Sequence, residues 1–93
     1  MKNLKLGLQL GYWGAAPNPQ MVDIAQEAER LGYDAIFTAE AWGSDVFTPL
    51  AWIGAHTSRI RLGTGIAQLS ARAPTATAMA ALSLDHLSGG RMI

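Results

Sequence analysis

The chain has 93 residues, of which 49% are hydrophobic and 15% are charged, and seven basic residues balance seven acidic ones. This composition fits a buried, helix-covered sheet better than a disordered segment. A formal net charge of zero gives no concentrated basic face, so neither a nucleic acid nor a membrane surface is expected as a partner. The sequence has no cysteine, which excludes disulfides, thiolate metal sites and a cysteine nucleophile in this stretch.

The N-terminal segment Met1–Leu10 predicts a strand and not a secretion signal. Leucines alternate with other residues from Leu4 to Leu10, and this period of two is typical of a strand. The early lysines are not followed by a continuous apolar region, as a signal peptide would require. No apolar run approaches the roughly 20 residues that a membrane helix needs. We therefore expect a cytoplasmic protein.

A first helix is predicted after the strand and its aromatic loop. Asn18 followed by Pro19 is a good helix start, because the asparagine side chain can cap and the missing proline N–H costs nothing there. Apolar residues from Met21 to Leu31 then recur at helical spacing. Gly32 supplies a left-handed stop.

A second strand and helix follow. The short apolar run Ala35–Thr38 predicts a strand that is covered on both faces. Thr48 and Pro49 repeat the cap-then-proline start, and Leu50–His56 is predicted as a helix. Trp52, inside that helix, is expected in the core.

A third unit and the beginning of a fourth complete the chain. Ile60–Leu62 predicts a strand that continues into Gly63–Ile66. After Pro74, the alanine-rich segment Thr75–Leu87 predicts a helix. Arg91–Ile93 is predicted as the first residues of a fourth strand.

Strands that alternate with helices at this spacing predict βαβ units and a parallel sheet. The connections are unequal in length. Long ones follow the strands and short ones follow the helices, at 11–18, 39–47 and 63–74 against 32–34, 57–59 and 88–90. Long loops at the C-terminal ends of strands match the active face of a (β/α)8 barrel. We therefore predict an α/β fold that is the N-terminal portion of such a barrel, with three βα units and the start of strand four.

A doubly wound open sheet is the competing architecture, and periodicity alone leaves it open. Its usual signature, G-x-G-x-x-G directly after the first strand, is absent because Tyr12 and Trp13 separate the two glycines there. The stretch Gly63–Gly65 has only the first two glycines of that signature.

Glu40 lies just beyond the second predicted strand, where a carboxylate can face the mouth of a barrel. It could act as a general acid or base, or accept a hydrogen bond from a substrate or cofactor. It could equally be a solvated loop carboxylate or an ion-pair partner of Arg72.

Two tryptophans and a pair of glycines lie on the same face. Trp13 and Trp42 could wall a flat aromatic ligand, or they could simply pack under the loops. The glycines of Gly63–Ala67 permit a bulge and the close approach of a planar ligand, although glycine is also common at an ordinary strand exit. His56 and His86 fall on predicted helices, so we expect no metal site.

These segments together resemble the luciferase-like (bacterial luciferase-type) oxidoreductases, and within them the branch that uses the deazaflavin coenzyme F-420. The motifs that carry the resemblance are Gly7–Trp13, Ala25–Asp34, Thr38–Asp45, Arg61–Ile66 and Leu84–Arg91. Their order and spacing along nearly all of the chain are more specific than any one of them.

The resemblance implies a (β/α)8 barrel that binds a planar ring at its C-terminal mouth. Members of the family transfer a hydride with F-420 or carry out flavin-dependent oxygenation with FMN. The family also has a bulge, often with a non-prolyl cis peptide, at the end of strand three. By position this bulge falls on Gly65 and Ile66, and the same strand end adds Thr64 as a cofactor-binding residue, with Trp13 in the first loop.

The resemblance also places the catalytic position at Glu40, with Trp42 beside it. Several deazaflavin relatives have a histidine there, so the site is carried over to Glu40 but the proton-transfer role is left open. A glutamate could act as a general acid near neutral pH only if desolvation raised its pKa.

The predicted function is therefore hydride transfer between F-420 and a small organic substrate, and an FMN-dependent monooxygenase is the alternative. Residues 1–93 are expected to form a partial luciferase-like domain that is truncated at its C-terminal end. A complete barrel takes about 250 residues. The chain alone could thus be a catalytically inactive half-barrel that self-associates as a homo-oligomer through its unpaired strand edge.

Overall fold

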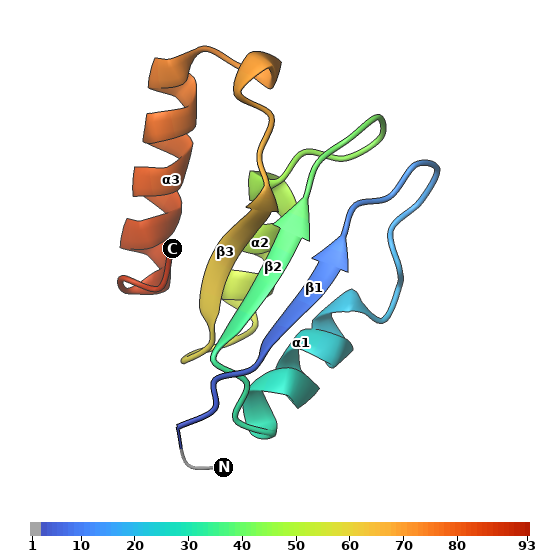
Figure 1. Cartoon of the computed structure of the whole chain (residues 1–93), viewed down its shortest axis with the longest axis vertical. Helices are drawn as coiled ribbons and strands as arrows, with labels where there is room; N and C mark the ends of the chain where they lie inside the picture. The colour runs from blue at the N-terminus through green and yellow to red at the C-terminus, as the bar shows by residue number, and fades with distance from the viewer. Residues whose placement is uncertain (1–2) are drawn as a thin grey trace.

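The computed structural model describes residues 3–93, in which three strands and three helices alternate along the chain (Figure 1). Met1 and Lys2, the first residues of the predicted N-terminal strand segment, lie outside the described residues. Within 3–93, no helix is both long enough and apolar enough to cross a membrane.

The strands β1 (Gly7–Gly11), β2 (Ala35–Ala39) and β3 (Arg61–Ile66) form a parallel sheet in the order β1-β2-β3. The predicted strand order and direction are therefore confirmed. β1 begins later than the leucine alternation predicts, because its only partner, β2, begins at Ala35, which pairs with Gly7. The leucine alternation starts at Leu4, whereas pairing with β2 starts at Gly7.

The helices α1 (Met21–Arg30), α2 (Phe47–Ala55) and α3 (Pro74–Ser88) lie close to their predicted positions. α1 begins at Met21, so the predicted start with Asn18 as cap and Pro19 as first residue is wrong; Asn18 Oδ1 instead accepts a hydrogen bond from Gln20 N at 2.9 Å, before the helix. Gly32 follows α1 with a φ of 86° and supplies the predicted left-handed turn, and Gly89 follows α3 with a similar φ of 75°.

α2 begins at Phe47, earlier than the Thr48–Pro49 pattern predicts. The reason is Asp45, whose Oδ2 accepts hydrogen bonds from Phe47 N at 3.1 Å and Thr48 N at 2.9 Å. A carboxylate at this position satisfies two of the N–H groups that a helix start leaves free. Pro49 is accordingly buried within the first turn of α2 and does not lie at its first residue.

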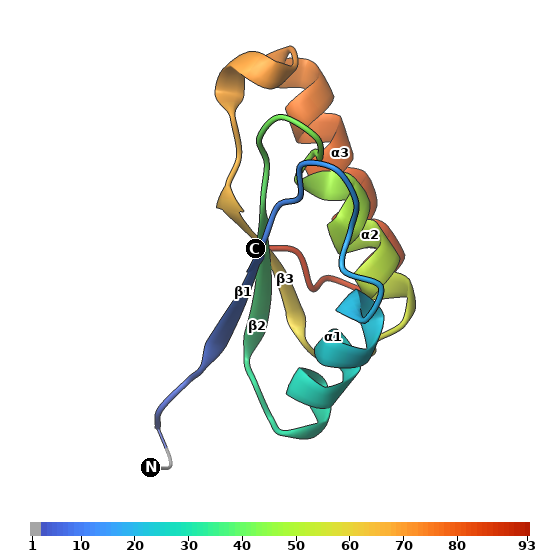
Figure 2. The same ribbon diagram turned by 90° about the vertical axis from the view of Figure 1, so that its right-hand side faces the viewer.

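All three helices cover the same face of the sheet (Figure 2). A doubly wound sheet has helices on both faces, whereas a barrel has them only outside. The one-sided arrangement, with consecutive strands adjacent, is that of the barrel. The competing open-sheet interpretation is therefore wrong.

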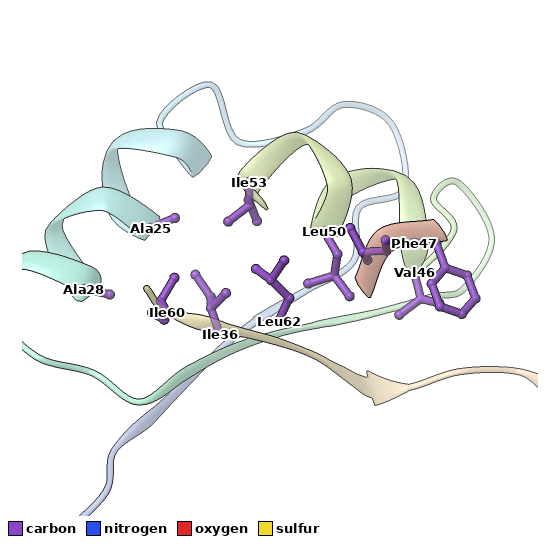
Figure 3. Packing of buried hydrophobic residues seen from close by; sticks show 10 residues of the cluster. Ala25, Ala28, Ile36, Val46, Phe47, Leu50, Ile53, Ile60 and Leu62 are labelled. Atoms are coloured by element: carbon purple, nitrogen blue, oxygen red, sulfur yellow. The ribbon is translucent and has the colours of Figure 1, made fainter. Parts of the chain in front are cut away.

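The core lies between this face and the helices (Figure 3). Its buried side chains come from the three helices, from β2 and β3, and from residues directly before α2 and β3. They are Ala25, Ala28, Ile36, Val46, Phe47, Leu50, Ile53, Ile60, Leu62 and Leu84. Trp52 is not among them, because 59% of it is exposed on the outer side of α2. Its predicted place in the core is wrong, since α2 is apolar on all sides and its spacing does not identify the buried face.

The segment Arg91–Ile93 runs beside β3 as predicted. Leu62 and Met92 form a parallel bridge, in which Leu62 N donates to Arg91 O and Ile93 N donates to Leu62 O, both at 2.8 Å. The guanidinium of Arg91 turns back beneath the helices. It donates to the carbonyl oxygens of Gly54 and Ser88 at 2.8 Å each, and so closes the C-terminal ends of α2 and α3.

The opposite face of the sheet carries no helix (Figure 2). On it the ring of Phe37 lies between two glycines on the neighbouring strands. A β-carbon on Gly7 would lie 2.8 Å from this ring, and one on Gly63 would lie 2.5 Å from it. The glycines at positions 7 and 63 thus leave room for the ring of Phe37 on the open face.

Candidate functional site

The long connections follow the C-terminal ends of the three strands and gather at one edge of the sheet (Figure 1). The connection after β3 contains a short 3-10 turn, η1 (Leu69–Ala71), within the loop predicted from residue 63 to 74. This edge holds every predicted site residue, and their side chains fall into three separate places.

The carboxylate of Glu40 lies at the centre of the first place. Glu40 is 6% exposed, and it accepts hydrogen bonds from donors on two different loops. Val46 N donates to Oε1 at 3.2 Å, and Gln68 N donates to Oε2 at 2.6 Å. Both terminal nitrogens of Arg72 also donate to the carboxylate, one of them to Oε2 at 3.1 Å. The interpretation of Glu40 as a partner of Arg72 is confirmed.

The charge state of Glu40 follows from these donors. The hydrogen bonds from Arg72 lower the pKa of Glu40, and those from the Gln68 and Val46 amides lower it further, although burial opposes them. A general acid at neutral pH needs the opposite shift. The carboxylate is therefore ionised and fully engaged, which suits a residue that holds loops together.

Arg72 is held on its other side by an aromatic ring. Its guanidinium carbon lies 5.2 Å from the centroid of the Phe47 ring, at a distance typical of a cation–π contact. Only 18% of the Arg72 side chain is exposed. The guanidinium thus contacts both Glu40 and Phe47.

Trp42 occupies a different environment from Glu40, although the two share the rim of a hollow of about 320 Å³. The turn 41–44 is closed by hydrogen bonds between Ala41 and Ser44, and Trp42 lies at its tip with a φ of 45°. This left-handed backbone is uncommon outside glycine. The indole is 99% exposed, so nothing in residues 3–93 packs on it.

The second place is the end of β3. Thr38 pairs with Thr64 and Ala39 pairs with Ile66, so Gly65 is an extra residue that forms a bulge. The bulge predicted at Gly65 and Ile66 is confirmed. The accompanying expectation of a cis peptide is wrong, because residues 3–93 contain none.

Strand alternation separates the three predicted residues of this strand end. Gly63 and Gly65 lie on the open face, where an added β-carbon would meet Phe37 and Gln9 respectively. Thr64 falls on the side of the buried Leu62, beneath the helices. Only the backbone of Thr64 can therefore contribute to a site on the open face, while Ile66 is 66% exposed at the strand end.

Gln9 is a site residue that was not predicted. Its Oε1 accepts a hydrogen bond from Gly11 N at 2.8 Å, which fixes the carboxamide on the open face. The Nε2 group lies where a side chain on Gly65 would be. The leucine alternation around Gln9 indicated which face it occupies, but not that its amide reaches the third strand.

Trp13 lies in the third place, away from the bulge. Trp13 N donates to Ser44 Oγ at 3.0 Å, and the loop then folds back over the start of α1 and α2. The indole lines an apolar groove together with residues such as Met21 and Trp52. The structure thus does not bring Trp13 to the open face of the sheet, because its loop crosses to the helix side.

No group of three or more histidine, aspartate or glutamate side chains in residues 3–93 is arranged to hold a metal ion. His56 ends α2, where its Nδ1 lies 2.8 Å from Trp52 O.

A protein-family model described as luciferase-like monooxygenase matches residues 8–93. The chain belongs to this family. The luciferase-like resemblance of the motifs is therefore confirmed, and so is the assignment of the fold as part of a barrel.

Individual relatives agree with the family. The chain is 66% identical over 90 residues to a Mycobacterium tuberculosis protein named "Putative coenzyme F420-dependent oxidoreductase Rv3520c", covering 97% of this chain and 26% of that protein. It matches the structure of a coenzyme F420-dependent tetrahydromethanopterin reductase from Methanopyrus kandleri with a TM-score of 0.85 and 26% identity, over 97% of this chain and 26% of the other.

A monooxygenase structure matches nearly as well. The monooxygenase RslO1 from Streptomyces bottropensis gives a TM-score of 0.83 at 27% identity, over 96% of this chain and 31% of the other. The same strand and helix arrangement thus occurs in an F420-dependent reductase and in a monooxygenase. The chain spans about a quarter to a third of the length of these relatives.

Proposed function

We propose that the protein containing this chain is a coenzyme F-420-dependent oxidoreductase that exchanges a hydride with a small organic substrate. The observation that carries the proposal is the glycine bulge at the end of β3, at the edge of the sheet where barrel enzymes place their sites. The 66% identity to a protein named as an F420-dependent oxidoreductase supports this choice of cofactor.

The residues at the bulge fit one face of a planar ring. Gly65 is exposed, and the Gln9 carboxamide fills the space where its β-carbon would lie, so a planar ring would meet the strand end together with this amide. The neighbouring Ile66 offers an exposed apolar side chain, and Gln9 offers a fixed amide donor on the same face as Gly65. When bound, F-420 would supply the hydride chemistry, while these residues would orient it and shield one face.

Glu40 and Trp42 are proposed to belong to the rim of this site. The lowered pKa of Glu40, caused first by Arg72, does not suit proton donation, so we propose no proton transfer for it. Trp42 is proposed as a ligand contact, because its exposed indole stands at the rim of the hollow beside Glu40.

An FMN-dependent monooxygenase is the second candidate. The likeness to monooxygenase RslO1 favours it, since its TM-score of 0.83 is close to that of the F420-dependent reductase. An FMN ring would meet the same residues at the bulge as a deazaflavin ring, so the bulge alone supports both cofactors.

The discriminating experiment offers each reduced cofactor to purified protein that contains this chain. We expect the protein to oxidise reduced F-420 in the presence of a suitable acceptor, and the change in F-420 absorbance would measure this reaction. We expect no turnover with FMNH2 and oxygen. Turnover with FMNH2 and oxygen, together with no response to reduced F-420, would overturn the proposal in favour of the monooxygenase.

A binding titration addresses the 93-residue chain itself. F-420 fluorescence and sedimentation would be measured on the same samples. Tight, stoichiometric binding by a monomer would rule out the alternative of an inactive, self-associating half-barrel. Self-association without binding would support that alternative.

A further inference from the structure

Glu40 holds the backbone just after the β3 bulge at two points. Its own backbone N donates to Ile66 O at 3.2 Å, and its Oε2 accepts from Gln68 N at 2.6 Å. Glu40, the residue directly after β2, therefore hydrogen-bonds to both ends of the short stretch 66–68. The next backbone bond along this loop, from Ala71 N to Gln68 O at 3.1 Å, stays inside η1 and anchors nothing outside it.

The carboxylate is itself held in place by Arg72. Both terminal nitrogens of the guanidinium donate to it, and Phe47 lies against the guanidinium. Such a paired arrangement fixes direction as well as distance. Because Val46 N donates to the same carboxylate, the loop after β2 and the loop after β3 are joined at one buried point.

We propose that Arg72 and Glu40 are positioning residues, which together set the backbone of 66–68 and hence the shape of the ligand floor at Gly65 and Ile66. This inference rests on the proposed function for its ligand, but not for its effect on the loop. Arg72 does not touch the floor itself. It acts through the Glu40 carboxylate, which would otherwise be a buried charge without a cation.

A direct anion-binding role for Arg72 competes with this proposal. The geometry argues against it, because the guanidinium already has two bonds to Glu40 and an aromatic ring against it. A ligand that took the place of Glu40 on the guanidinium would leave Gln68 N and Val46 N without their acceptor.

The test compares Arg72→Met, Arg72→Lys and Glu40→Gln with Arg30→Met as the matched control. Arg30 also pairs with a glutamate, Glu27, but on the exposed surface of α1. Circular dichroism melts would fix a temperature at which every variant is folded. Hydrogen exchange of peptides covering 66–70 and F-420 affinity would then be measured at that temperature.

For Arg72→Met and Glu40→Gln we expect exchange in 66–70 to rise about tenfold or more, because local opening loses its buried anchor. We expect F-420 affinity to fall about tenfold, since a small displacement of a binding surface is costly. Arg72→Lys should recover part of both effects, and Arg30→Met should change neither.

Unchanged exchange in 66–70 for Arg72→Met would overturn the inference, whichever cofactor binds. Faster exchange with undiminished F-420 affinity would overturn the link between the clamp and the ligand floor. If the unmodified protein binds no F-420 while exchange still rises in the variants, the proposed function fails and the role of Arg72 and Glu40 in the loop stands.

Discussion

The side-chain carboxamide of Gln9 occupies the space that a β-carbon on Gly65 would need, although these residues lie on strands that do not pair with each other. The amide reaches across the end of β2, whose Thr38 carbonyl oxygen would lie 3.0 Å from the same β-carbon. Gly65 is therefore required by its neighbours even before any ligand is considered.

For Gly65→Ala we expect a loss of about 1–2 kcal/mol in unfolding free energy, because Gln9 must rotate away and give up its bond to Gly11. Urea unfolding would measure it. The control is Gly14→Ala, where an added β-carbon meets nothing within 4 Å and the change should stay within about 0.5 kcal/mol. The double variant Gln9→Ala with Gly65→Ala should recover part of the loss, and an equal or larger loss would contradict this account.

Arg91 joins two helix ends to β3, so its replacement should destabilise the whole unit. For Arg91→Met we expect a loss of about 2–4 kcal/mol, because the carbonyls of Gly54 and Ser88 lose their donor in a partly buried place. Thermal unfolding followed by circular dichroism would measure the loss. Arg59→Met is the control, since its guanidinium makes one long contact of 3.4 Å to a backbone oxygen. Equal losses in both variants would show that the helix ends do not depend on Arg91.

The carboxylate of Glu29 accepts hydrogen bonds from the backbone N of Ser58, Arg59 and Ile60, at 2.9, 2.6 and 2.8 Å to Oε2. Burial alone would raise the pKa of Glu29, but these donors outweigh it and the pKa is lowered. The stabilisation is therefore complete above the unfolded pKa of about 4.5 and is lost as pH falls through the lower folded value.

For Glu29→Gln we expect a loss of about 1 kcal/mol at pH 7, kept small by partial solvent exposure, and a flatter decline of stability below pH 4.5. Urea midpoints from pH 7 down to pH 3 would measure it. Glu27→Gln is the matched control on the same helix, where the pair with Arg30 is exposed and screened. If stability fell as steeply at low pH in Glu29→Gln as in the unmodified chain, the lowered pKa of Glu29 would be contradicted.

The Glu40 and Arg72 pair should show strong coupling in a double-mutant cycle. Removing one partner leaves the other charge poorly compensated, so Glu40→Gln and Arg72→Met should each cost about 2–4 kcal/mol, and the double variant less than their sum. Urea unfolding of the unmodified chain, the two single variants and the double variant measures the coupling. The exposed pair of Asp34 and Arg61 supplies the control cycle, in which we expect near additivity.

The same pair gives a pH dependence with a defined sign. Because Arg72 lowers the pKa of Glu40, the contribution of the pair is present at neutral pH and is lost as pH falls through the folded pKa. The unmodified chain should therefore lose more stability on acidification than Glu40→Gln does. An equal loss of stability on acidification in the two proteins would contradict the lowered pKa of Glu40.

Local patterns in the sequence predicted most of the fold, because strands, helices and their stops depend on spacing and on residues such as Gly32 and Gly89. Of the element starts that were misplaced, one is set by a distant strand and one by a nearby carboxylate. β1 starts where β2 can pair with it, and α2 starts where Asp45 caps it. Trp52 could not be placed from the sequence, since an apolar helix surface carries no directional signal.

The site too could be predicted only in part. The bulge at Gly65 was placed by the family resemblance, because two glycines at a strand end permit a bulge but also occur at an ordinary strand exit. The donors to Glu40 come from Val46, Gln68 and Arg72, and no periodicity reveals that these meet at one carboxylate.

The exposed turn that carries Trp42 gives the protein an optical reporter of its own. The chain has three tryptophans, and their surroundings differ, because Trp13 is half-buried, Trp52 is 59% exposed and Trp42 is 99% exposed. The indole of Trp42 should thus emit at the longest wavelength of the three and be quenched most readily by iodide. Any molecule that covers the turn 41–44 would shift that emission to the blue and protect it from the quencher, so occupancy of the rim can be followed without an added label.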